Sequence, residues 1–288
     1  MIEIHDDISA IAERYDAFIL DVWGVLHDGT AAYPGVPEAL IRLHEAGKKI
    51  AILSNAPRRA LHVESRMVEL GVPKGRYDLI MSSGEETWRC LLDRPDAFYR
   101  SLGPKCFHIG PARDENLFEG ANLIRVDDVA GADFILNSGP WGYDETLADH
   151  EDRLQVAAKR RLPMICANPD LVVMIGTRIV ICAGTIARRY EALGGTVRYH
   201  GKPHPSVYER IMATFSDVPK KRICAIGDTL RTDIAGANAV GIDGWLVTGG
   251  VHAEEFGVGP GERPDPAKIV EAINREGHIP AGALVGLR

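Results

Sequence analysis

Acidic residues follow two apolar runs that lie far apart in the chain. Asp21 comes directly after Phe18-Ile19-Leu20, and Asp228 and Asp233 come after a second run near the C-terminus. A carboxylate at the carboxyl end of a parallel strand faces the crevice where α/β proteins bind ligands. Such oxygen ligands suit Mg²⁺, whereas the same carboxylates without a cation would repel one another. The pattern therefore predicts a magnesium site at strand ends.

Three further residues between these acids favour phosphoryl transfer. Ser54 and Asn55 precede a helix-like segment, where a hydroxyl and backbone N–H groups suit a phosphate. Lys202 precedes another such segment and would neutralise a phosphate and a nearby carboxylate. A carboxylate such as Asp21 can itself accept a phosphoryl group. Each residue alone also fits an ordinary cap, turn or solvated side chain, so their order and placement carry the prediction.

The bulk composition is that of an ordinary globular enzyme. The chain has 288 residues, a hydrophobic content of 45% and a net charge of -7, which argues against a nucleic-acid partner or an anionic membrane surface. Neither a signal peptide nor an apolar run long enough to span a bilayer is present, so we expect a cytoplasmic protein. The five cysteines form no CxxC pair and fit buried free thiols: Cys90, Cys106, Cys166, Cys182 and Cys224.

Alternating apolar and helix-like segments predict a parallel α/β sheet. The expected strands are 17–21, 49–53, 78–81, 105–109, 132–136, 164–167, 171–175, 178–182, 196–199, 222–226 and 244–247, with a hairpin turn at Gly176-Thr177. The expected helices are 34–46, one with Pro57 at its first position, one from Gly84, and 145–160, 183–193, 205–215, 232–240 and 269–275, followed by a Gly/Pro-containing tail.

The four chemical motifs lie in the first and last thirds of the chain, which makes the middle an insertion. We expect a core domain formed by 1–86 and 195–288, interrupted by a second α/β domain over 87–194. A domain inserted at the crevice would close over it and exclude water and macromolecules. This arrangement favours a small-molecule substrate.

The four motifs in this order resemble the haloacid dehalogenase (HAD) superfamily of Mg²⁺-dependent phosphohydrolases. The position of the insertion is similar to that of the C2 cap subclass. The segments Ala167-Asn168-Pro169-Asp170, Ala183-Gly184-Thr185-Ile186-Ala187 and Gly201-Lys202-Pro203 resemble the class IIA branch, with its NagD-like and p-nitrophenyl phosphatase members. The resemblance covers most of the chain and implies a Rossmann-like parallel-sheet core with an inserted α/β C2 cap.

The resemblance also implies roles for single residues. Asp21 would be the nucleophile and a metal ligand, together with Asp228, Asp233 and the backbone carbonyl of Trp23. Ser54 and Lys202 would hold the phosphoryl oxygens. The residues expected to bind substrate are Ser54, Asn55, Asn168 and Asp170. The partner would be a small phosphorylated metabolite, with neither nucleic acid nor membrane, and a homodimer is allowed because cap-mediated dimers occur in similar proteins.

One residue departs from the family pattern. Position 23 is Trp, where the usual Asp protonates the leaving group and then activates water. A backbone carbonyl ligand survives this change, whereas acid–base catalysis, typically about 10²–10⁴-fold, does not. His27 or Asp28 could supply the proton, although both also fit polar residues of a turn. The cap, the substrate or a good leaving group could also replace the acid.

Three function classes remain open at this point. The leading hypothesis is a phosphatase, a phosphoric monoester hydrolase. A binding or regulatory protein with a degenerate site is supported by Trp23, but a pure binder has no need of the nucleophile Asp21 beside the metal. A phosphotransferase would pass the phosphoryl group to an acceptor other than water. A dehalogenase is disfavoured, because that chemistry has no need of the pair Asp228 and Asp233.

Overall fold

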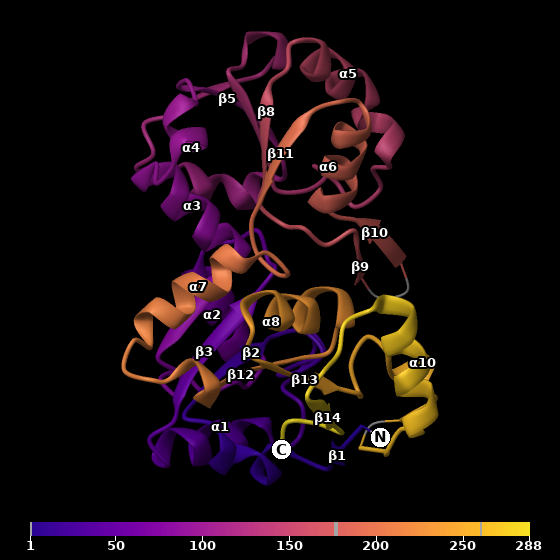
Figure 1. Ribbon diagram of the computed structural model, residues 1–288. Coiled ribbons are helices and arrows are strands. Elements are labelled where there is room, and N and C mark those ends of the chain that lie inside the picture. The colour runs from indigo at the N-terminus through magenta and orange to yellow at the C-terminus, as the bar shows by residue number, and fades with distance from the viewer. Residues whose placement is uncertain (1, 176–177, 260) are drawn as a thin grey trace. The chain divides into compact units, whose positions relative to one another are not determined.

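Two parallel sheets, each in its own α/β unit, organise the chain (Figure 1). The structure, a computed structural model, describes residues 2–175, 178–259 and 261–288. The first unit comprises the chain up to Ser54, Leu61–Met81 and Lys202–Arg288. The second comprises Asn55–Ala60 and Ser82–Gly201. The fold class expected from the sequence, a Rossmann-like parallel sheet with an inserted α/β unit, is therefore confirmed.

The first unit is built on a seven-stranded sheet of order β1-β14-β13-β12-β2-β3-β4. Its strands are β1 (Ile4–His5), β2 (Ala17–Asp21), β3 (Lys49–Ser54), β4 (Leu79–Ser82), β12 (Ile223–Gly227), β13 (Asp243–Val247) and β14 (Gly282–Leu284). The chain leaves β2 toward β3 and β4 on one side, and later adds β12, β13 and β14 on the other. The strand order therefore reverses between β2 and β12, where open α/β sheets bind ligands.

Apolar faces of the helices hold this sheet in place. The helices of the first unit are α1 (Val36–Glu45), α2 (Ala60–Glu69), α7 (Pro205–Thr214), α8 (Ala235–Val240), α9 (Ala253–Phe256) and α10 (Pro266–Glu276). One buried cluster joins Ile19 of β2 and Ala225 of β12 to Tyr208 of α7 and Val240 of α8. This packing fixes the two strands whose ends carry acidic residues.

The second unit has a five-stranded sheet of order β11-β8-β7-β5-β6. Its strands are β5 (Lys105–Ile109), β6 (Ile124–Val126), β7 (Phe134–Asn137), β8 (Pro163–Cys166) and β11 (Thr196–Tyr199), with a separate antiparallel pair β9 (Val172–Ile175) and β10 (Arg178–Ile181). Its helices are α3 (Ser83–Asp93), α4 (Ala97–Ser101), α5 (Glu151–Lys159) and α6 (Ala183–Ala192). The hairpin turn expected at Gly176-Thr177 lies outside the described residues.

Several expected elements differ from those observed. Strand β11, expected in the core, pairs with β8 in the second unit. The second unit, which contains Ser82–Gly201, is longer at both ends than the expected range 87–194. The tail holds β14, which pairs with β13 and β1. The helix expected over 145–160 is α5 preceded by a 3₁₀ turn, Leu147–His150. The helix expected over 232–240 begins as a π-turn, Leu230–Ile234, before α8.

The helix expected to begin at Pro57 begins at Ala60 instead. The intervening residues are held by the second unit, because the carbonyl of Ala56 accepts from the N–H of Gly84 at 3.1 Å and that of Arg58 accepts from the hydroxyl of Ser82. Since these bonds fix the carbonyls outside a helix, the expected helix start at Pro57 is wrong.

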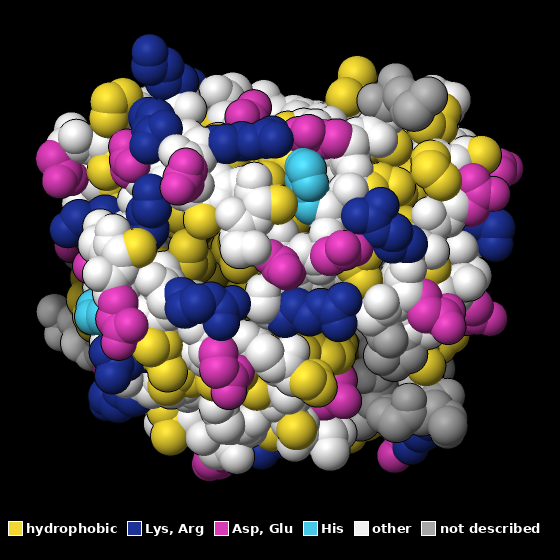
Figure 2. Space-filling model, turned by 90° about the horizontal axis from the view of Figure 1, so that it is seen from below, with side chains coloured by type: hydrophobic (Ala, Val, Ile, Leu, Met, Phe, Trp, Pro, Cys, Tyr) yellow, Lys and Arg dark blue, Asp and Glu magenta, His cyan; other side chains and the backbone are white. Residues whose placement is uncertain are grey.

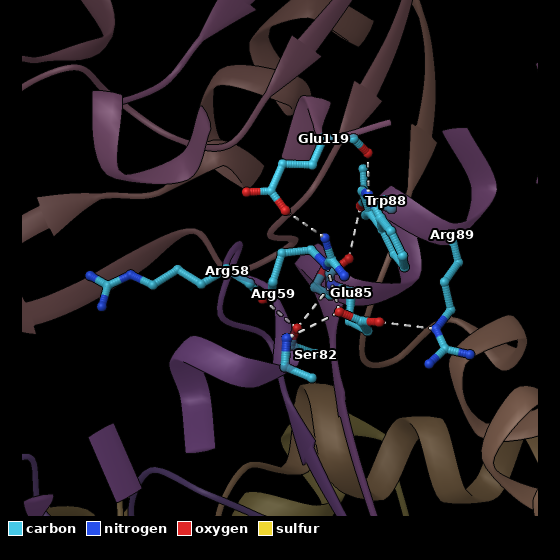
Figure 3. A network of polar contacts seen from close by, with 10 residues as sticks. Arg58, Arg59, Ser82, Glu85, Trp88, Arg89 and Glu119 are labelled. Carbon is cyan, nitrogen blue, oxygen red and sulfur yellow. Dashed lines mark hydrogen bonds and ion pairs between the residues drawn. The ribbon is translucent and has the colours of Figure 1, made fainter. Parts of the chain in front are cut away.

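Arg59 anchors this segment to α3, as Figure 3 shows. Its Nε donates to Glu85 at 2.7 Å, and its guanidinium lies 3.2 Å from the centre of the Trp88 ring. Burial alone would raise the pKa of Glu85, but the hydrogen bonds from Arg59, the backbone N–H of Ala60 and Arg89, with the charge of Arg59, together outweigh it and lower this pKa. Arg89 approaches the same carboxylate at 3.1 Å from a more exposed position. The segment 55–60 is therefore tied to the second unit by a largely buried ion pair.

Replacement of Arg59 by Ala should destabilise the second unit more than replacement of Arg89. Arg59→Ala leaves a buried carboxylate without its main partner and should cost about 1–3 kcal/mol of unfolding free energy. Arg89→Ala removes a more exposed partner and should cost less than about 1 kcal/mol. Urea unfolding of both variants followed by circular dichroism measures the difference, and equal losses would contradict this assignment.

Charges of both signs are interspersed on the face of the molecule drawn in Figure 2. Basic and acidic side chains alternate there with scattered apolar ones. Among the described residues, no helix combines the length and the apolar character that crossing a membrane requires.

Candidate active site

Three carboxylates meet at the reversal point of the first sheet. Asp21 is the last residue of β2, and Asp228 follows β12, its neighbour in the sheet. Asp233 lies in the π-turn after β12, the kind of helix irregularity that occurs at functional sites. One oxygen from each carboxylate lies within 4.8 Å of the others, and all three residues are buried. The structure thus brings together the three acids named from the sequence.

Lys202 supplies a positive charge to this cluster. Its ammonium group is buried and donates to Oδ1 of Asp21 and, at 2.7 Å, to Oδ1 of Asp233. With all four groups ionised, three carboxylates and one ammonium leave a net charge of about -2, which a bound divalent cation would cancel. The donor set consists of oxygens alone, which suits Mg²⁺.

The pKa directions follow from this crowding of charge. Burial and then the neighbouring Asp233 raise the pKa of Asp21, and the same two causes raise that of Asp228 to about 6. Burial opposes the charge of Lys202, but Asp21 and Asp233 outweigh it and raise the pKa of the ammonium group. The lysine therefore stays charged, whereas Asp21 and Asp228 take up a proton more readily than free carboxylates unless a cation is bound.

Glycines create the space that two of these acids occupy. A Cβ at Gly227 would lie 2.0 Å from Cγ of Asp233, and a Cβ at Gly24 would lie 2.0 Å from Oδ2 of Asp228. Gly24 also has φ +78°, which side chains disfavour. A Cβ at a third glycine, Gly250, would lie 2.2 Å from the same oxygen, Oδ2 of Asp228. The backbone is thus shaped around Asp228 and Asp233.

Two partners of Asp228 were not identified from the sequence. Its Oδ2 accepts from the backbone N–H of Val251 at 2.7 Å, and its Oδ1 accepts from the hydroxyl of Thr229 at 2.9 Å. The Gly249-Gly250 pair after β13 marks a close backbone approach and is the one sequence signal that could have indicated this loop. These bonds orient the Asp228 carboxylate.

The remaining residues expected at the site fall into two groups. Ser54 ends β3, one position beyond Leu53, which pairs with Asp21. The other three lie together within the second unit. There, Nδ2 of Asn55 donates to Asp170 at 2.8 Å. Oδ1 of Asn168 accepts from the backbone N–H of Asp170 at 3.0 Å.

Trp23 lies against the loop that follows it. Its side chain is 51% exposed, and its ring meets His27 edge-on with centroids 5.5 Å apart. A Cβ at Gly29 would lie 2.3 Å from the indole, so the ring covers that glycine. The indole therefore packs against the loop 27–29.

His27 and Asp28, the expected substitutes for the missing acid, both have structural partners. Nδ1 of the buried His27 accepts from the N–H of Gly29 at 3.1 Å, and burial lowers the pKa of this imidazole. Asp28 accepts from the N–H groups of Thr30 and Ala31, and these bonds lower its pKa. Both observations favour the interpretation of His27 and Asp28 as polar residues that stabilise a turn.

The cysteines offer no activated thiol in the described part of the chain. All five are buried and free of disulfides. Burial raises the pKa of four thiols, those of Cys106, Cys166, Cys182 and Cys224. A thiol nucleophile needs the opposite shift.

Comparison with known proteins identifies the family. The haloacid dehalogenase-like hydrolase model matches residues 18–124, and an HAD-hydrolase-like model matches 199–274. A solved hydrolase of the haloacid dehalogenase-like family from Brucella suis is 33% identical, with a TM-score of 0.82, over 98% of this chain and 99% of its own. The chain belongs to the haloacid dehalogenase-like hydrolase family.

Two further relatives of this HAD hydrolase carry enzyme names. The 4-nitrophenylphosphatase of Thermotoga maritima is 26% identical, with a TM-score of 0.72, over 96% of both chains. The glycerol-3-phosphate phosphatase of Gallus gallus is 27% identical over 90% of this chain and 88% of its own. The class IIA assignment made from the sequence is confirmed, and so is the prediction that the chain is an enzyme of the phosphatase class.

Substitution of Gly227 by Ala should weaken binding of a divalent cation. The added methyl group collides with Asp233 and displaces its carboxylate, so affinity for Mg²⁺ should fall by about 10–100-fold. Isothermal titration with Mg²⁺ measures the change. Gly286→Ala is the matched control, because a Cβ there meets nothing within 4 Å. Unchanged affinity in a folded Gly227→Ala variant would contradict this role for the cluster.

Proposed function

We propose that this HAD hydrolase is a Mg²⁺-dependent phosphatase that acts on a small phosphorylated metabolite through an aspartyl phosphate. The observation that carries the proposal is the buried group of three carboxylates and Lys202, with its net charge near -2 and its all-oxygen donor set. A cation held there would balance that charge and also bind phosphate oxygens.

Asp21 is the nucleophile in this proposal. One of its oxygens accepts from Lys202, and the other can attack phosphorus. The metal ligands would be Asp21, Asp228, Asp233 and the backbone carbonyl of Trp23. When bound, Mg²⁺ would polarise the phosphoryl group and favour the ionised form of Asp21. Lys202 would hold a phosphoryl oxygen and neutralise the charge that develops there.

The reaction proceeds in two steps at Asp21. The bond between phosphorus and the leaving oxygen breaks as a bond between phosphorus and the Asp21 carboxylate forms. Water then cleaves this acyl phosphate, which releases inorganic phosphate and restores Asp21. Trp23 provides no exchangeable acid for the first step and no base for the second. The leaving group must therefore depart with a proton from water, the substrate or another residue.

Substrate recognition is assigned to four residues. Ser54, at the end of β3, would bind a phosphoryl oxygen together with Lys202. Asn55, Asn168 and Asp170, which bond to one another in the second unit, would contact the rest of the substrate. Two relatives are named for glycerol 3-phosphate and 4-nitrophenyl phosphate, which supports a small phosphate monoester here. The five free cysteines support a reducing compartment such as the cytoplasm.

Trp23 supports a second candidate, a phosphate-binding or regulatory protein with a degenerate catalytic site. The packing of its half-exposed ring on Gly29 supports a structural use of this side chain, which is expected to stand at the position of the acid. The buried contact of Asp21 with Lys202 favours the enzyme, because a binding protein requires no nucleophile beside the cation. A phosphotransferase uses the same first step and differs only in the acceptor.

Phosphate release from p-nitrophenyl phosphate is the primary test of function. Wild-type protein with Mg²⁺ should release phosphate, whereas Asp21→Asn should lose activity by at least about 10³-fold, because the nucleophile is gone. EDTA should have a similar effect on the wild-type protein. Wild-type activity no higher than that of Asp21→Asn would instead favour the binding protein. Transfer to added alcohols rather than to water would identify a phosphotransferase.

Trp23→Asp should raise turnover by restoring a group that exchanges protons. The gain should reach up to about 10²–10⁴-fold for an alkyl phosphate such as glycerol phosphate, and less for p-nitrophenyl phosphate, whose leaving group needs little acid. Trp23→Asn is the matched control, since it removes the indole without supplying an acid. Equal rates for the Asp and Asn variants would show that acid–base catalysis at position 23 does not limit this protein.

A further inference from the structure

A polar cavity lies in the second unit and shares no residue with the carboxylate cluster. It has a volume of about 210 Å³. Six of its lining residues are Phe107, His108, Arg125, Asp127, Trp141 and Arg153. They come from β5, from β6 and the residue after it, from the loop after β7, and from α5. The cavity is thus assembled from four separate parts of the sheet and its cover.

The position of this cavity follows the rule that places ligands in open α/β sheets. From β5 the chain adds β6 on one side, and then β7, β8 and β11 on the other. The strand order therefore reverses between β5 and β7, and the cavity lies beside this point, where residues of β5 and β6 line it. Sheets of this order bind ligands at that point. His108 of β5 and Ser138 after β7 are joined across it by a hydrogen bond of 3.0 Å.

Two arginines give the cavity its charge. Arg153 donates to the backbone carbonyl of Asp149 at 3.0 Å and lies 5.1 Å from the Trp141 ring, which orients its guanidinium. Arg125 pairs with Glu115 at 2.6 Å, and both side chains are about half exposed. An exposed pair of this kind is worth about 0–1 kcal/mol, so an anion can replace Glu115 at little cost.

The remaining lining narrows the class of ligand. Burial, and then the nearby Arg125, lower the pKa of His108 to about 4, so its ring is neutral at pH 7 and the arginines alone attract an anion. The carboxylate of Asp127 cannot accept from an anion, but it can accept from a hydroxyl group. Trp141 adds an aromatic side chain to the lining, which C–H groups can contact, and stacking on His150 with centroids 5.3 Å apart holds its ring in place. The volume admits only a small molecule.

We propose that this cavity binds a small hydroxylated oxyanion, a polyol or sugar fragment that carries one phosphate or carboxylate group. The two arginines hold the anionic end, Asp127 accepts from a hydroxyl and Trp141 covers the carbon chain. The bound molecule is distinct in place from the substrate of the proposed phosphatase. The proposal does not depend on that activity.

Tryptophan fluorescence of the Asp21→Asn protein in EDTA tests the proposal without turnover. Glycerol phosphate and glycerate are the two probes, one for each anionic group, and glycerol and inorganic phosphate are the controls that lack one half of the chemistry. At least one probe should give a saturable change at millimolar concentration, and should bind more tightly than either control. The probe that binds identifies the anionic group.

Three substitutions made in this background assign the signal to the cavity. Arg153→Gln should weaken binding by about tenfold or more, as expected for a lost charged hydrogen bond. Trp141→Phe should abolish the fluorescence change while a calorimetric titration still detects binding. Arg188→Gln removes an exposed arginine elsewhere in the same unit and should change neither result.

Two outcomes would overturn the proposal. One is the absence of any saturable signal from either probe, in fluorescence and in calorimetry alike. The other is a signal that persists in Arg153→Gln and Trp141→Phe but disappears in Lys202→Met, which would place all binding at the carboxylate cluster. Loss of phosphatase activity affects neither readout, so failure of the proposed function and failure of this site are distinguishable.

Discussion

The electrostatic balance of the buried carboxylate cluster is the constraint on which the rest of the first unit depends. Three buried acids within 4.8 Å of one another have a single lysine as their nearby positive charge, so their negative charges repel one another unless a further cation is bound. Parallel strands bring Asp21 and Asp228 to one edge of the sheet, and the π-turn brings Asp233 to the same place. The fold thus creates an unfavourable concentration of charge, which either a bound cation or the protonation of an acid relieves.

Backbone shape is as important to this cluster as the acids themselves. Three glycines leave the space that the carboxylates of Asp228 and Asp233 occupy, and a side chain at any of them would fill that space: Gly24, Gly227 and Gly250. The N–H of Val251 then orients the Asp228 carboxylate. Trp23 bears on whether metal binding at this cluster depends on an acid–base residue beside it. In the proposed function its backbone carbonyl would bind the metal while its indole packs on Gly29, so metal binding and proton transfer would depend on different atoms.

Local patterns in the sequence are sufficient to predict the strand ends and the acids that follow them, because an apolar run bounded by Asp is a short-range pattern. Features that depend on distant partners could not be predicted in the same way. Pro57 looks like a helix start, yet Ser82 and Gly84 hold the neighbouring carbonyls outside a helix. The sequence predicts a strand over 196–199, but it does not indicate the sheet to which this strand belongs. Its pairing with β8 decides that. The short β14 has too few residues for a periodic pattern and exists because β1 and β13 pair with it.

The same topological rule applies to both sheets of this protein. In the first sheet the order reverses beside Asp21, and acidic residues gather there. In the second it reverses beside His108, and the arginines Arg125 and Arg153 gather there instead. The carboxylate cluster has an excess of acids and suits a cation, whereas the cavity presents two arginines, partly balanced by Asp127 and by Glu115, to an anion. An inserted unit that served only as a cover would need no such charge at its own reversal point, which is why the cavity is better explained as a binding site than as a by-product of packing.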